Sequence, residues 1–156
     1  MRREAGTLRQ PKNATWRDRP MTNADMKNAD ETFENGDETK INYYHAHIYY
    51  GDDDAVREKA ARLREKAWAK WPGQVRMGRF RDTAVGPHPL AMYQIEFDHD
   101  LFAEIVPWLM YNRDGLTILL HPDAEDAFRD HAWYPFWMGE KLDLRLDFLR
   151  RGGRQA

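Results

Sequence analysis

The sequence has 156 residues, enough for one domain with an ordinary core. Its 26 acidic and 24 basic residues nearly cancel, so neither nucleic acid nor an anionic membrane is the expected main partner, since both favour a basic surplus. The absence of cysteine excludes disulfides, thiolate nucleophiles and cysteine-bound metals, so any metal ion would need His, Asp or Glu ligands. No apolar run approaches the roughly 20 residues that span a bilayer, and no apolar signal segment opens the sequence, so we expect a cytoplasmic protein.

The first part of the chain differs in composition from the rest. Residues 1–38 are rich in Arg, Asn, Asp, Thr and Pro, and Trp16 and Phe33 are their only aromatic residues. Such a segment buries too little apolar surface to offset the entropy lost on ordering. We therefore predict a disordered or loosely ordered N-terminal extension over residues 1–38 and a single domain over residues 39–150.

Hydrophobic patterns bounded by Gly, Pro and Asp predict the elements of this domain. Aromatic and β-branched runs predict strands at 41–50, 74–80, 90–97 and 116–121. Apolar residues at steps of three and four predict one helix from the aspartates at 52–54 to Trp71, ended by Pro72-Gly73. A second helix begins at Asp98 or Asp100 and runs through Met110, with Pro107 expected to kink or split it. Two short helices are expected near Ala124–Asp130 and Gly139–Leu146.

This βαββαβ order predicts an α+β, ferredoxin-like sandwich with a four-stranded antiparallel sheet and a short C-terminal helical extension. The first strand is central and antiparallel to both the third and the fourth. The two helices cover one face of the sheet. The other face is left for a ligand site, for the C-terminal segment or for a second subunit.

Histidines converge on that second face. Side chains alternate along a strand, so His45 and His47 share one face of the first strand. Antiparallel pairing brings His121 beside His45 and places Gln94 and Glu96 along the same stretch. His88 precedes the third strand, near the far end of the first.

Each of these residues also has a plain structural interpretation. A His-X-His pair in a strand is more often hydrogen-bonded than metal-bound, His88 between two prolines could shape a rigid loop, and the whole face could be a dimer interface. The convergence of separate segments favours a metal or catalytic site instead. His99 is expected at a helix N-terminus, and His131 could close over the site or have no role.

Several segments resemble the DOPA 4,5-dioxygenase family, over roughly Ile41 to Leu146. The segments are Tyr44-His45-Ala46-His47-Ile48-Tyr49, Gly86-Pro87-His88-Pro89, Tyr93-Gln94-Ile95-Glu96-Phe97, Asn112-Arg113-Asp114-Gly115-Leu116, Leu120-His121-Pro122, Asp130-His131 and Trp137-Met138-Gly139. The resemblance implies a ferredoxin-like fold, a homodimer, and extradiol cleavage of a catechol such as L-DOPA by O2.

Extradiol cleavage needs a ferrous ion with open positions, which three protein ligands on one side of the ion would leave. We therefore expect Fe(II), or zinc in the protein as purified, held by His45, His47 and His121, with Glu96 able to replace one of them. His88 is the candidate acid/base, because imidazole transfers protons near neutral pH. If His45 and His47 cannot both reach one metal, His88 becomes a ligand. The alternative function is a non-oxidative metal-binding or ligand-binding dimeric protein on the same fold.

Overall fold

The computed structural model describes residues 33–150. Its contacts divide the chain into residues 1–35 and 36–156, and the described part of the first unit, residues 33–35, contains no helix or strand. The predicted extension over residues 1–38 therefore lies mostly outside the described residues and stays a prediction. Its last residue, Glu38, begins the 3₁₀ helix η2 (Glu38–Lys40).

The main elements follow one another in the predicted βαββαβ order. They are β1 (Tyr43–Tyr49), α2 (Asp54–Lys70), β2 (Val75–Met77), β3 (Met92–Asp98), α3 (Phe102–Asn112) and β4 (Thr117–Asp123), with the 3₁₀ helix η3 (His99–Leu101) before α3. The Asp53 side chain caps α2 by accepting a hydrogen bond from the backbone of Val56. Pro107 lies inside α3 without splitting it, and the buried neighbours Ile105, Val106 and Leu109 hold that helix against the sheet.

The sheet has five strands, so the prediction of four was wrong. Its order is β2-β3-β1-β4-β5, and every neighbouring pair is antiparallel. The additional strand, β5 (Phe136–Met138), pairs with residues 118–120 of β4. Without it β4 would be an edge strand with unpaired backbone groups, and an aromatic, apolar segment is well suited to cover that edge.

The C-terminal helices also differ from the prediction. The helix α4 spans Ala127–Ala132, three residues later than expected at its start, because Asp126 accepts hydrogen bonds from Phe128 and Arg129 and thereby caps it. Residues 139–146 form no helix, and a short helix, α5, follows at Asp147–Arg150. No described helix is long and apolar enough to cross a membrane.

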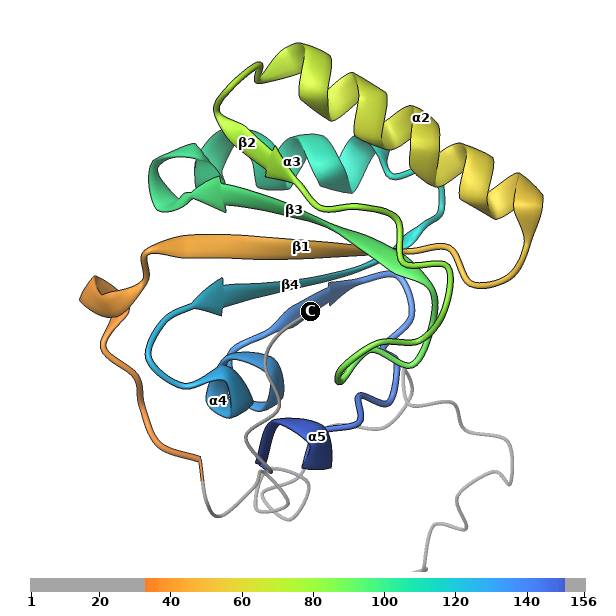
Figure 1. Ribbon diagram of the computed structural model, residues 1–156. Coiled ribbons are helices and arrows are strands. Elements are labelled where there is room, and N and C mark those ends of the chain that lie inside the picture. The colour runs from red at the N-terminus through yellow and green to blue at the C-terminus, as the bar shows by residue number, and fades with distance from the viewer. Residues whose placement is uncertain (1–32, 151–156) are drawn as a thin grey trace, which may run out of the picture. The chain divides into compact units, whose positions relative to one another are not determined.

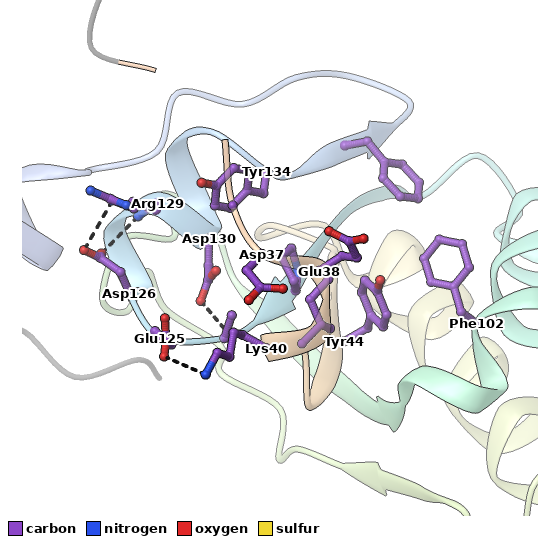
Figure 2. A pocket seen from close by; sticks show the side chains of 15 residues that line it. Asp37, Glu38, Lys40, Tyr44, Phe102, Glu125, Asp126, Arg129, Asp130 and Tyr134 are labelled. Atoms are coloured by element: carbon purple, nitrogen blue, oxygen red, sulfur yellow. Dashed lines mark hydrogen bonds and ion pairs between the residues drawn. The ribbon is translucent and has the colours of Figure 1, made fainter. Parts of the chain in front are cut away.

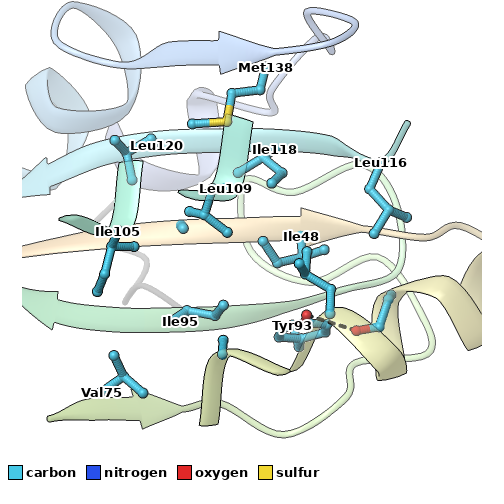
Figure 3. Close-up of a cluster of buried hydrophobic side chains, with 14 of the residues drawn as sticks. Ile48, Val75, Tyr93, Ile95, Ile105, Leu109, Leu116, Ile118, Leu120 and Met138 are labelled. Carbon is cyan, nitrogen blue, oxygen red and sulfur yellow. Dashed lines mark hydrogen bonds between the residues drawn. The ribbon is translucent and has the colours of Figure 1, made fainter. Parts of the chain in front are cut away.

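The two faces of the sheet are covered by different parts of the chain. Helices α2 and α3 pack on one face, and α4 and α5 lie on the other (Figure 1). The first face carries the main core, in which side chains such as Ile48, Ile95 and Ile118 meet Leu109 (Figure 3). On the second face a small apolar cluster of Tyr49, Met92 and Leu119 packs against Val85, Trp137, Leu142 and Leu144. The C-terminal segment therefore encloses the face where the sequence places its histidines.

Candidate metal centre

Strands β1 and β4 place three histidines on the enclosed face, as predicted from their alternation. His45 pairs with His121 in the sheet register, and His47 lies one alternation further along β1. The exposed fractions of His45, His47 and His121 are 5%, 1% and 1%. Imidazoles buried this completely must find partners within the protein or in a ligand.

His88 reaches the same place from the loop between β2 and β3. A tight turn at Gly86, whose φ of 58° favours glycine, lets the His88 backbone N–H bond to the Val85 carbonyl at 3.0 Å. The centroid of the His88 ring then lies 4.0 Å from that of His47. Arg145 holds this loop from the C-terminal segment, since its guanidinium donates to the His88 carbonyl and its backbone N–H to the Pro87 carbonyl.

His131 completes the cluster from α4. Its ring centroid lies 3.9 Å from that of His121, and the residue is 2% exposed. The neighbouring Asp130 accepts a hydrogen bond from the backbone of Ala124, at 3.0 Å, which ties α4 to the end of β4. The sequence left the role of His131 open, and only the return of α4 onto the sheet brings it into the cluster.

The five histidines offer two overlapping sets of metal ligands. In each set, one ring nitrogen per residue lies within 4.8 Å of the others: His45, His47 and His121 form one set, and His47, His88 and His131 form the other. His47 belongs to both. The first set is the one expected from the sequence, whereas the second makes His88 a ligand.

Hydrogen bonds indicate which ring nitrogens are available. The Nδ1 atoms of His121 and His131 donate to the Pro122 and Ala127 carbonyls, at 2.6 and 2.8 Å, so the lone pair of each ring lies on Nε2. The Nε2 atoms of His47 and His121 are 3.0 Å apart, so His47 donates there and its own lone pair lies on Nδ1. His88 Nδ1 lies 2.7 Å from the Tyr49 hydroxyl, and in the tautomer whose Nδ1–H donates to that oxygen the His88 lone pair lies on Nε2.

Three of these nitrogens have no hydrogen-bond partner within the described part of the chain. They are His47 Nδ1, His88 Nε2 and His131 Nε2, and all three are buried. A buried polar atom without a partner costs about 1–3 kcal/mol. One metal ion between them would satisfy all three, and hydrogen bonds from the other ring nitrogen to an oxygen are typical of metal-bound histidine. The residues therefore fit a metal ion.

Burial keeps these imidazoles neutral. It lowers the pKa of His47 and of His121 well below the usual value, and the neighbouring histidines lower both further. The pKa of His88 falls to about 3 and that of His131 to about 4, again mainly through burial. Burial also raises the pKa of the Tyr49 hydroxyl, which therefore keeps its proton. Neutral rings retain the lone pairs that metal ligation requires.

The other predicted polar residues lie at the rim or outside. Glu96 belongs to neither ligand set; one of its oxygens lies 3.1 Å from His45 Nε2, and the other pairs with Arg76. His99 is exposed and contacts the carboxylates of Asp98 and Asp100.

A pocket of about 440 Å³ adjoins His131 on the enclosed face. His131 is part of its lining, together with the indoles of Trp133 and Trp137 and the side chains of Lys141 and Leu142. A space of this size with aromatic walls can take one small ring compound. The sequence suggested that tyrosines and tryptophans near the site contact a substrate, but it could not identify which ones. The pocket forms only when residues 131–146 fold back onto the sheet.

Fold and site together define a small α+β domain with a buried histidine cluster that can hold a metal ion. The model of the Dopa 4,5-dioxygenase family matches residues 44–148, and the chain belongs to that family. A crystal structure of a candidate dioxygenase from Nostoc punctiforme is 45% identical, with a TM-score of 0.70, and the match covers 76% of this chain and all of that one.

Two fungal relatives match at lower identity. An uncharacterized 21.2 kDa protein of Botryotinia fuckeliana is 35% identical over 117 residues, and a protein of Amanita muscaria named DOPA 4,5-dioxygenase is 31% identical over 118 residues. The matches cover 69% and 70% of this chain but only 63% and 50% of the two relatives, so the chain spans part of their length.

Proposed function

We propose that the protein is an extradiol dioxygenase that opens the ring of a catechol, for which L-DOPA is the first substrate to test, with iron(II) held by the histidine cluster. Membership of the Dopa 4,5-dioxygenase family and the name of the Amanita relative support the reaction class. The observation that carries the proposal is the set of three buried ring nitrogens without partners, on His47, His88 and His131. Bound iron(II) would supply the positions at which the catechol and O2 meet.

The hydrogen bonds favour His47, His88 and His131 as the ligand set. His45 already faces the Glu96 carboxylate, and His121 already accepts from His47. Every member of the other set has a buried ring nitrogen without a hydrogen-bond partner among the described residues, whereas both ring nitrogens of His121 are already engaged. In this arrangement His88 binds the metal, and the earlier assignment of His88 as acid/base applies only if His45, His47 and His121 are the ligands.

The chain itself would hold the substrate and exclude water. The indoles of Trp133 and Trp137 offer flat apolar surfaces to a catechol ring in the adjoining pocket, and Lys141 offers a positive charge to a carboxylate. The His45–Glu96 pair at the rim can accept or return a proton, since an imidazole with a carboxylate partner is suited to that task. A homodimer remains a further prediction, to be tested by sedimentation.

Oxygen uptake tests the reaction. Protein loaded anaerobically with Fe(II) is mixed with L-DOPA or a simpler catechol, and O2 consumption is followed together with visible absorbance of the ring-opened product. We expect one O2 consumed per product formed, and no activity in His47→Ala. His99→Ala is the matched control, because His99 is an exposed histidine outside the cluster. Bound iron without O2 uptake on any catechol would reject ring cleavage and leave the non-oxidative metal-binding alternative.

Metal content distinguishes the two ligand sets. His131→Ala removes a ligand only from the favoured set, and His45→Ala only from the other. We expect metal analysis to show less than a tenth of the wild-type iron in His131→Ala and near-normal iron in His45→Ala. The opposite pattern would assign the metal to His45, His47 and His121. Circular dichroism of both variants checks that the fold is kept.

A further inference from the structure

A second pocket, of about 360 Å³, lies at the end of β1 and β4, and side chains of η2, α3 and α4 surround it (Figure 2). Tyr44 and Pro122 line it, and they alternate along their strands with His45 and His121. The pocket is therefore separate from the candidate metal centre.

Aromatic side chains form one wall of this pocket. The ring centroids of Tyr44 and Phe102 are 4.7 Å apart, and Phe136 lies 6.5 Å from Phe102. Tyr134 lines the pocket as well and packs so closely over Gly36 that a Cβ at that glycine would lie 3.1 Å from its ring. Such rings can bind the apolar part of a ligand and also attract a cation to their faces.

The remaining lining is acidic. Five carboxylates and two cationic side chains line the pocket: Asp37, Glu38, Glu125, Asp126 and Asp130, against Lys40 and Arg129. Ion pairs offset two of the acids, since Lys40 lies 3.9 Å from Glu125 and Arg129 lies 3.9 Å from Asp126. Asp37, Glu38 and Asp130 have no cationic side chain within ion-pair distance among the described residues, which leaves the pocket with a surplus of negative charge.

Asp130 is the carboxylate whose hydrogen bonding indicates a ligand site. The residue is 1% exposed, and one of its oxygens accepts the hydrogen bond from the Ala124 backbone. Its second oxygen accepts no hydrogen bond from the residues that the structure describes, although Asp130 lines the pocket beside Asp37 and Lys40 (Figure 2). That oxygen is available to the pocket, and a cationic donor there would form a charge-assisted hydrogen bond with it.

We infer that this pocket is a binding site for a small organic cation, an amine with an apolar body. The ammonium group would lie among Asp130, Glu38 and Asp37, and the apolar body against Tyr44, Phe102 and Phe136. Charge and hydrogen bonding select the cation over a neutral or anionic ligand of the same shape. The site does not depend on the proposed ring-opening reaction.

Three ligands of nearly the same shape test the inference: phenethylamine, 2-phenylethanol and 3-phenylpropionate, which are a cation, a neutral molecule and an anion at pH 7. None is a catechol, and binding is measured by calorimetry on metal-stripped protein at low salt. We expect phenethylamine to bind at least tenfold more tightly than the alcohol and the anion to bind most weakly. Equal affinity for the three, or no binding of phenethylamine at millimolar concentration, would overturn the inference.

Substitutions locate the binding. Asp130→Asn should weaken phenethylamine binding at least tenfold, and Glu38→Gln, at an exposed residue of η2 that does not threaten the fold, at least threefold. Glu65→Gln is the matched control, since Glu65 is an exposed glutamate of α2 outside the pocket. His47→Ala should bind phenethylamine as the wild type does, which separates this site from the metal centre. Unchanged affinity in both Asp130→Asn and Glu38→Gln would reject the assigned pocket.

Discussion

The hydrogen bond between Tyr49 and His88 offers a direct test of the proposed ligand set. The Tyr49 hydroxyl lies 2.7 Å from His88 Nδ1, and both side chains are buried. Tyr49→Phe removes that oxygen and keeps the ring, which stacks on Trp137 at 5.9 Å. If His88 binds the metal through Nε2, its orientation and basicity depend on this hydrogen bond.

The expected loss follows from what the hydroxyl does for His88. Removing the hydrogen-bond partner of a metal-bound histidine typically weakens metal binding about 10–100-fold, which corresponds to roughly 1.4–2.8 kcal/mol. In the metal-free protein the same change leaves His88 Nδ1 buried without a partner, which should lower the free energy of unfolding by about 1–3 kcal/mol. Both effects come from one atom, because the packing of the ring is unchanged.

The assay is a competition titration of Co(II) or Zn(II) against a chromophoric chelator, for the wild type, Tyr49→Phe and Tyr50→Phe. Tyr50 is the matched control, because its hydroxyl donates to Asp82 at 2.9 Å and takes no part in the cluster. We expect metal affinity to fall in Tyr49→Phe and to stay unchanged in Tyr50→Phe. Wild-type affinity in Tyr49→Phe would refute the assignment of His88 as a ligand and favour the set His45, His47 and His121.

Three further outcomes follow from the same site. Metal-stripped protein should lose stability as the pH falls below about 6.5: the unfolded histidines then bind protons, while buried His88 and His131, with pKa values of about 3 and 4, stay neutral. At pH 5 each of these two histidines should lower the free energy of unfolding by roughly 2 kcal/mol relative to pH 7.5. Equal urea midpoints at the two pH values would show that the two rings are not buried as neutral groups. Leu119→Ala, at a fully buried residue on the same face, should lower the free energy of unfolding by about 2–5 kcal/mol in urea titrations, and a loss below 1 kcal/mol would mean that this face is loosely packed. Trp137→Leu should raise KM for the catechol several-fold in oxygen-uptake assays, because Trp137 lines the proposed substrate pocket without belonging to either ligand set; a normal KM would place the substrate elsewhere.

Local pattern was enough to predict four of the five strands and the meeting of His45, His47 and His121 on one face. The alternation of His45 and His47 with Ala46 and Ile48 distinguishes a polar face from a face packed under helices, and β1 shows this division. The βαββαβ order then makes β1 central, which brings His121 beside His45 without any knowledge of side-chain packing. These conclusions depend on the period of two along a strand and on chain order, both of which can be read directly from the residues.

Only the tertiary structure decided how that face is closed. Residues 136–138 become a fifth strand because β4 has an edge to pair, and α4 returns onto the sheet through the bond between Asp130 and Ala124. Neither contact has a local sequence signal, since both depend on surfaces that earlier elements create. The entry of His131 into the cluster, the proposed change of His88 from acid/base to ligand and the place of Asp130 in the lining of a second pocket all follow from this closure. The sequence by itself determined which residues could meet at the site, and long-range packing of the C-terminal segment determined which of them are buried together with nitrogens free to bind a metal.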